Sequence, residues 1–322
     1  MKIRAGRQYV DEADWLHLDG VSARLGLGRN WDVLAFLGRP VTYYSGTHND
    51  WAGGAAVGWR YRPTGRARLL YYRYDQDETR AGDRFALDLW DSLGAVRVHA
   101  RATVLDDHFD RLDLDASYYC DKARLQLDGR YSRLFHTLED ESLPFNPLYT
   151  ALGDLQPYHY GQARILKFLG ERWTLSGGIT GRVVDGGDEN ATNQDYLNED
   201  ITLAFMPTEQ WFLSLSAQRW DAEGDNRLSG LYGDATWRPN KQWELSAGAG
   251  VVDYVYEYYD DITFKDEYHR APDARSYYLR ARWRPRPEFA LSARAELEDN
   301  VQTDDGGEDT FFSLRTMLSV YF

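Results

Sequence analysis

Three observations predict an all-β fold, a transmembrane antiparallel β-barrel of about 18 strands, within a range of 16 to 18. Many segments alternate apolar and polar residues over roughly the 9 to 11 residues that a tilted strand needs to cross a bilayer. Short turns and long loops join them alternately. Aromatic residues make up 15% of the chain although its mean hydropathy is −0.61. A barrel explains this combination, because each strand shows one face to lipid and the other to water.

The alternating segments account for most of the chain, which we expect to form one barrel domain over residues 1–322. No helical periodicity of useful length competes with them. In chain order, strands are predicted near residues 2–10, 20–28, 31–41, 50–62, 66–76, 83–92, 95–105, 110–120, 123–134, 158–168, 172–184, 197–206, 210–220, 228–238, 242–254, 275–285, 288–298 and 309–322.

The connections between these segments differ in length in a regular way. Short turns are predicted near residues 28–30, 63–65, 92–94, 121–122, 170–171, 207–209, 239–241 and 285–287. Longer polar loops are predicted at 135–157, 184–196, 221–227, 254–274 and 299–309. Short periplasmic turns and long extracellular loops are the asymmetry of outer-membrane barrels. Counting strands back from the end of the chain places both termini on the short-turn side, which favours an even strand number.

The last strand alternates strictly and ends on an aromatic residue. Phe312, Leu314, Leu318 and Phe322 fall on one face, and Arg315 falls on the other. A half-buried strand of a soluble protein has the same pattern. A closing strand that ends on Phe is also similar to those of bacterial outer-membrane barrels, which implies that Phe322 is an assembly signal. A closed barrel then depends on pairing of this strand with residues 2–10.

Composition excludes several other classes of protein. No segment approaches the ~20 apolar residues of a membrane helix. A single cysteine, Cys120, gives neither a disulfide framework nor a cysteine-based metal site. A formal net charge of −14 argues against nucleic-acid binding. No signal peptide precedes the first strand pattern, so we expect the sequence of an exported protein to be a mature or recombinant form here, or to be incomplete at its start.

Aromatic residues recur beside the short turns. Tryptophan suits the headgroup level of a bilayer because its ring is amphipathic, so these residues predict a periplasmic aromatic girdle. In a soluble fold they would be core residues instead. The predicted girdle consists of Trp59, Trp173, Trp211, Trp237, Trp243, Trp283 and Phe289.

Alternation assigns the two faces of each strand. In the segment 210–220, Trp211, Leu213 and Leu215 point outward, while Ser214 and Ser216 point inward. Polar or small inward residues indicate a wet interior. The predicted inward arginines are Arg24, Arg60, Arg62, Arg66, Arg68, Arg97, Arg101, Arg124, Arg130, Arg164, Arg182, Arg280, Arg282, Arg284, Arg294 and Arg315. Inward acids are fewer, and most of the negative charge falls in the long loops.

Two interpretations of the inward arginines remain open. They could pair with inward acids across strands and hold the wall together. They could also stay uncompensated and attract anions, because guanidinium groups bind carboxylate and phosphate in bidentate fashion. The second interpretation predicts an anion-binding lumen.

No local motif for catalysis or cofactor binding occurs. The chain lacks C-x-x-C-H, H-E-x-x-H, G-x-S-x-G and phosphate-loop patterns, so we expect neither an enzyme nor a bound cofactor or metal. An outer-membrane hydrolase could still assemble serine, histidine and acid from separate strands. His99, between Arg97 and Arg101, is expected to line the lumen rather than to act as a base.

Over its whole length the chain resembles bacterial outer-membrane channels, which implies the outer membrane as its location, and membrane lipid and the barrel assembly machinery as partners. Arg4-Ala5-Gly6-Arg7-Gln8, followed by Leu18-Asp19-Gly20 and Arg24, resembles the early strands of alginate-export porins. That resemblance implies passive diffusion or export of anionic solutes or a polysaccharide.

Tyrosine- and tryptophan-rich strands with R-P turns also resemble the barrel of porin-cytochrome conduits, which implies a sheath around a multihaem cytochrome. In either case, the loops 135–157 and 254–274 could fold inward and constrict the lumen.

Overall fold

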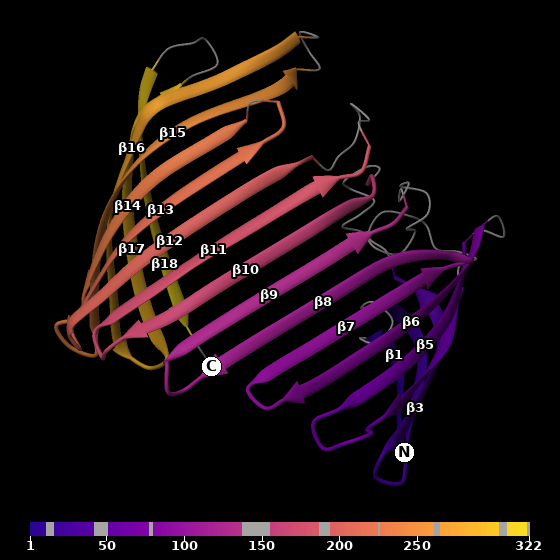
Figure 1. Ribbon diagram of the computed structural model, residues 1–322. Coiled ribbons are helices and arrows are strands. Elements are labelled where there is room, and N and C mark those ends of the chain that lie inside the picture. The colour runs from indigo at the N-terminus through magenta and orange to yellow at the C-terminus, as the bar shows by residue number, and fades with distance from the viewer. Residues whose placement is uncertain are drawn as a thin grey trace. The chain divides into compact units, whose positions relative to one another are not determined.

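The computed structural model describes residues 1–10, 16–41, 51–76, 80–136, 155–186, 194–224, 226–260, 265–302 and 308–320. Within these residues the fold is all-β, with 18 strands in one antiparallel sheet. Strands that follow one another in the chain lie side by side, as β5 to β8 and β11 to β14 show (Figure 1). Among the described residues, no helix is long and apolar enough to cross a membrane.

All of the predicted strands are confirmed, with boundaries that shift by a few residues. The strands are β1 (Lys2–Val10), β2 (Leu16–Leu27), β3 (Trp31–Pro40), β4 (Trp51–Trp59), β5 (Arg66–Gln76), β6 (Arg80–Leu93), β7 (Val96–Leu105), β8 (His108–Cys120), β9 (Leu125–Leu134), β10 (Tyr158–Leu169), β11 (Trp173–Val184), β12 (Tyr196–Thr208), β13 (Trp211–Ala222), β14 (Arg227–Trp237), β15 (Trp243–Asp260), β16 (Lys265–Arg286), β17 (Phe289–Gln302) and β18 (Glu308–Val320).

The chain divides into two compact units. The first comprises residues 1–119, 128–161 and 182–194, and the second comprises residues 120–127, 162–181 and 195–322. The first contains the antiparallel pairs from β1–β2 to β7–β8. The second contains those from β12–β13 to β17–β18. The single barrel domain and its closure by β18 and β1 stay predictions.

Cross-strand partners share a face of the sheet, so the pairing defines two faces in each unit. We call the face that carries Trp59 in the first unit and Trp211 in the second the tryptophan face. The opposite face, with Arg24 in the first unit and Arg280 in the second, is the arginine face. On β18, Leu314 pairs with Ala295 of the tryptophan face and Arg315 pairs with Arg294 of the arginine face, which confirms the predicted alternation of that strand.

The tryptophan face exposes large apolar side chains in both units. Leu37 is 60% exposed and Leu69 is 57% exposed in the first unit, and Leu279 is 66% exposed in the second. Along β3 this apolar row runs from Trp31 to Leu37 and ends at Arg39. Seven residues at ~3.3 Å each give about 23 Å of strand, which is of the order of the ~25 Å apolar band of outer-membrane barrels.

Charged pairs end the apolar rows at the long-loop ends of the strands. Arg7 and Asp19 form a bidentate pair with both N–O distances at 2.9 Å. In the second unit, Arg219 Nε lies 2.7 Å from Asp221 Oδ2. Each unit therefore carries an apolar band between aromatic residues at the short turns and ion pairs at the other end.

The arginine face of the first unit also carries large apolar residues, so the expectation that inward residues are polar or small is wrong there. Leu18, Leu34, Phe36 and Leu70 are at most 5% exposed and belong to one apolar cluster. Register explains the cluster, because Leu34, Ala56 and Leu70 are consecutive cross-strand partners. Alternation fixes which residues share a face but does not require that face to be polar.

The predicted loop 254–274 is also wrong, because most of it is strand. β15 and β16 continue pairing from Tyr254 opposite Ala271 to Asp260 opposite Lys265. A register shift between Val252 and Tyr254 precedes this extension. Pro272 lies at this irregularity, where its missing N–H leaves no ladder hydrogen bond unmade. Inward folding of this segment as a constriction stays a prediction. The other predicted constriction is the loop 135–157, of which residues 137–154 lie outside the described part of the chain. Phe322, the predicted assembly signal, also lies outside it.

Glycines bring β1, β2 and β3 close together. Gly6 is opposite Gly20, and Gly20 is opposite Gly38. A Cβ added to Gly20 would lie 2.2 Å from the Leu37 carbonyl oxygen. Gln8 donates to the Gly20 carbonyl at 3.1 Å and accepts from Ser22 at 2.6 Å. The segment that resembles alginate-export porins therefore serves to hold β1 against β2.

We expect Gly20→Ala to destabilise the protein by about 1 to 3 kcal/mol, because the added methyl group meets backbone atoms that cannot move aside. Gly26→Ala is the matched control on the same strand and face, since a Cβ there would meet nothing within 4 Å. Urea unfolding from lipid vesicles measures the difference. Equal unfolding midpoints for the two variants would show that the close approach is unimportant.

Closure of the sheet predicts that the folded protein resists SDS at room temperature, since a closed barrel leaves no free strand edge at which unfolding can begin. Unheated protein should migrate faster on SDS gels than boiled protein. Identical migration of heated and unheated samples, from protein shown to be folded by circular dichroism, would contradict closure.

Candidate functional site

A cross-strand row of three arginines lies on the arginine face of the second unit. Arg280 on β16 is opposite Arg294 on β17, and Arg294 is opposite Arg315 on β18. On its other side, Arg280 is opposite Ser246, which exchanges a hydrogen bond with Thr236 at 2.9 Å. One row therefore passes from hydroxyl groups to three adjacent guanidinium groups.

The acids near this row only partly compensate it. Arg280 lies 3.5 Å from Glu244, and Arg294 lies 2.5 Å from Glu296. Arg315 has no ion-pair partner among the described residues, and its side chain is exposed. Like charges directly opposite each other destabilise a sheet. Repulsion among the three arginines therefore lowers the stability of the protein without a ligand, and a bound anion would reduce that repulsion.

Residues around Arg294 hold it in place. The Tyr278 ring lies over Gly248, where a Cβ would come within 2.3 Å of the ring. Its hydroxyl donates to Asp234 at 2.5 Å, so β14 and β16 are bridged across β15. The Arg294 guanidinium carbon lies 4.6 Å from the centroid of the same ring. A cation–π contact and an ion pair thus orient Arg294.

The arginines of the first unit are arranged differently, because acids alternate with them. Along one cross-strand row, Arg68 is opposite Asp88, Asp88 is opposite Arg101, and Arg101 is opposite Asp113. Asp88 is 1% exposed and lies 3.3 Å from Arg101 and 3.4 Å from His99. Arg66 donates to Asp32 at 2.8 Å. Arg66 and Arg101 therefore pair with acids across strands and hold the wall, which was the first of the two interpretations.

Most of the other predicted arginines also lie on the arginine face, with diverse partners. Arg130 lies 3.6 Å from Asp115, and Arg164 lies 3.6 Å from Asp200. Arg182 donates to the Gln194 carbonyl at 2.8 Å. Arg60, Arg97, Arg282 and Arg284 have no ion-pair partner among the described residues, and Arg24 is opposite Lys2. The role of these residues in anion binding stays a prediction.

Three of the predicted inward arginines lie outside the strands, because Arg60 directly follows the end of β4 and two others lie in turns. Arg124 has a φ of 47° and donates to the Gly170 carbonyl at 2.8 Å. Arg62 binds Asp91. Asp91 also accepts from the Tyr61 hydroxyl at 2.6 Å, and this hydrogen bond raises the pKa of Tyr61 above its ordinary value. Arg124 and Arg62 fasten neighbouring turns together, because alternation does not continue where a strand ends.

The aromatic residues predicted as a girdle lie at the short-turn ends of the strands, and several of them stack in pairs. Ring centroids are 5.7 Å apart for Trp211 and Trp237, and 6.0 Å apart for Trp243 and Trp283. Phe289 meets Trp283 edge to face, and Trp173 stacks on Phe205. Trp59 stacks on Trp31 at 5.6 Å. We had not included Trp31, although its place directly after a short turn is the same signal.

Two further cations of the arginine face, Lys2 and Arg4 on β1, were also missed. Their alternation was visible, but a strand at the start of the chain has only one known neighbour from which to judge its faces. Among the described residues, no group of three or more His, Cys, Asp or Glu is arranged to hold a metal ion.

Comparison with known proteins gives only distant structural similarity. No family model matches the chain, and no curated protein matches it. OpdK of Pseudomonas aeruginosa, crystallised with vanillate, is 11% identical with a TM-score of 0.48, over 99% of this chain and 95% of that chain. OmpT of Vibrio cholerae, an outer membrane protein, is 10% identical with a TM-score of 0.41, over 95% and 97%. A bacterial polysaccharide outer membrane secretin is 12% identical with a TM-score of 0.37, over 86% and 92%. With every one of these TM-scores below 0.5, the architecture rests on the strand pairing described above.

Proposed function

We propose that the chain is a bacterial outer-membrane β-barrel channel, not an enzyme, through which anions diffuse passively or are exported. The observation that carries this proposal is the row of Arg280, Arg294 and Arg315, three adjacent positive charges with incomplete compensation. Anionic solutes and acidic polysaccharides are the proposed cargo, because guanidinium groups pair with carboxylate and phosphate oxygens.

The tryptophan face supports placement in a membrane. Soluble proteins rarely expose contiguous apolar surfaces of more than a few hundred Å². Here whole strand faces expose Leu, Val and Phe side chains, with aromatic residues at one end and ion pairs at the other. Outer-membrane lipid is the partner that fits this surface, and insertion would need the barrel assembly machinery.

The arginine face supports conduction rather than tight binding. Selective passage requires sites that attract an ion but release it again, and several adjacent weak sites achieve this. Arg315 and Arg282 lack ion-pair partners among the described residues, whereas Arg280 and Arg294 share their charge with glutamates. An anion can thus be passed between neighbouring guanidinium groups. A barrel of about 18 strands is wide enough for an aqueous channel.

Purified protein in a planar bilayer should conduct by itself and should prefer Cl⁻ to K⁺, because uncompensated arginines raise the local anion concentration. The reversal potential under a KCl gradient measures this preference. A preference for K⁺ would overturn anion selectivity. Conductance that appears only with a co-purified multihaem cytochrome, or not at all, would favour the alternative of a sheath around such a partner.

Replacing an arginine that lacks a described ion-pair partner should change ion selectivity, whereas replacing one that pairs with a buried acid should change stability. The double variant Arg282→Gln/Arg315→Gln should move the reversal potential toward zero with little loss of stability, since neither side chain has a described ion-pair partner. Arg101→Gln should instead destabilise the protein by about 3 kcal/mol, because it removes the arginine paired with the buried Asp88 carboxylate.

Bilayer recordings and urea unfolding of the same variants separate these effects. Unfolding of the Arg282→Gln/Arg315→Gln variant at the midpoint of Arg101→Gln would show that all of these arginines are structural. An unchanged reversal potential in a stable double variant would remove Arg282 and Arg315 from the selectivity mechanism.

A further inference from the structure

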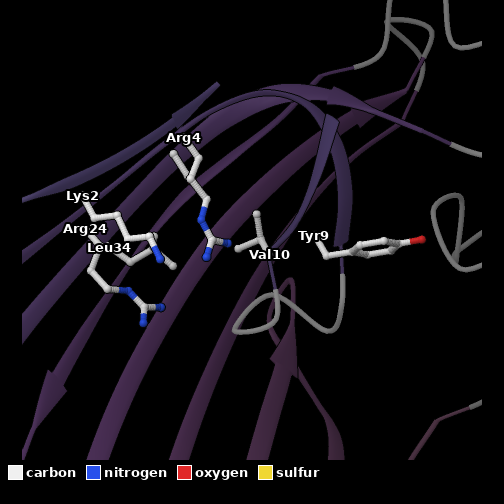
Figure 2. Close-up of a pocket in the computed structure, with 7 residues that line it drawn as sticks. Lys2, Arg4, Tyr9, Val10, Arg24 and Leu34 are labelled. Atoms are coloured by element: carbon white, nitrogen blue, oxygen red, sulfur yellow. The ribbon is translucent and has the colours of Figure 1, made fainter. Parts of the chain in front are cut away.

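A small hollow lies on the arginine face of the first unit, between β1 and β2. Its volume is about 100 Å³, and Lys2, Arg4, Arg24, Val10 and Leu34 contribute to its lining. Lys2 is directly opposite Arg24, and Arg4 is opposite Ser22. Figure 2 shows the Lys2, Arg4 and Arg24 side chains gathered on one side of the sheet, while Tyr9 points away from them.

The three cations occupy positions that disfavour one another. Lys2 and Arg24 are like charges directly opposite each other, which destabilises an antiparallel pair. Lys2 and Arg4 are exposed and have no ion-pair partner among the described residues. The Ser22 hydroxyl already donates to Gln8 Oε1 at 2.6 Å. The Lys2 ammonium and the Arg4 guanidinium are therefore hydrogen-bond donors open to a ligand in this hollow.

The other side of the hollow is apolar. Leu34 is 5% exposed and Val10 is 4% exposed, and both belong to the apolar cluster of the first unit. Leu34 is the cross-strand partner of Arg24, so a cation and an apolar side chain adjoin on the same face. Tyr9 also contributes to the lining, but its ring points away from the cations and stacks on His17 at 4.2 Å on the tryptophan face.

We propose that this hollow binds the oxyanion group of a small organic anion, either a carboxylate or a phosphate monoester, whose carbon portion rests on Leu34 and Val10. Lys2 and Arg4 supply the donors, and Arg24 adds a third positive charge beside them. The apolar side favours an organic anion over an inorganic one of the same charge. This site rests on the proposed function, since the ligand reaches it through the channel. It differs from the row of Arg280, Arg294 and Arg315, which has no adjoining apolar cluster of buried residues among those described.

The test is the block of single-channel Cl⁻ current by paired probes. Butyrate is compared with acetate, and butyl phosphate with inorganic phosphate, so that each pair shares a headgroup and differs in its carbon chain. In the wild-type protein, each longer probe should block at lower concentration than its short counterpart. The better of the two headgroups then identifies whether a carboxylate or a phosphate is preferred.

The double variant Lys2→Gln/Arg4→Gln should weaken block by the longer probes by about 10-fold or more, because two charged donors are lost. Arg97→Gln is the matched control, an exposed arginine on the same face of the same unit without a described ion-pair partner. Butyrate and butyl phosphate should block the Arg97→Gln variant at concentrations within about twofold of those that block the wild-type protein.

The results separate a failure of the proposed site in the hollow from a failure of the proposed channel. Equal block by long and short probes in the wild-type protein overturns the site even if no variant folds. Equal loss of block in the Lys2→Gln/Arg4→Gln and Arg97→Gln variants also overturns it, because the effect would then be one of general charge. In either case an unchanged Cl⁻ preference leaves the proposed channel intact, whereas a K⁺ preference in the wild-type protein overturns the channel proposal itself.

Discussion

The register of backbone hydrogen bonds between neighbouring strands is the constraint on which the rest of this structure depends. A slip by one residue would move every side chain of a strand to the opposite face. The pairing of Arg315 with Arg294 puts a charge beside a charge, and that of Leu314 with Ala295 puts an apolar residue beside an apolar one. The apolar band and the arginine row are therefore consequences of the same ladder.

The features that could be predicted from the sequence are those that depend on alternation alone. The strands, their order, the faces of β13 and β18, and the aromatic residues at the short turns all follow from a repeat of two residues and from turn chemistry. Each of these needs information from only one strand and its ends. Trp31 was missed although the same signal marks it.

The features that could not be predicted depend on which residues of two strands meet. Alternation placed Arg101 and Arg294 on the same kind of face, but it could not show that the first pairs with Asp88 and the second faces Arg280. The apolar cluster around Leu34 and Leu70 has the same origin, as does the shift at Val252 that lets β15 and β16 extend. Sequence alone could not show which arginines lie opposite acids and which lie opposite other arginines, whereas the register of the strands shows both.

The contact of Tyr278 with Gly248 has a consequence for the width of the passage. A wall residue with no side chain lets the ring lie flat, with its hydroxyl on Asp234. Tyr232 lies over Gly250 in the same way, since a Cβ there would come within 2.6 Å of its ring. In the proposed channel, Gly248 and Gly250 of β15 therefore determine how far the rings of Tyr278 and Tyr232 project into the passage. The conductance would then depend on two glycines that do not themselves contact the solute.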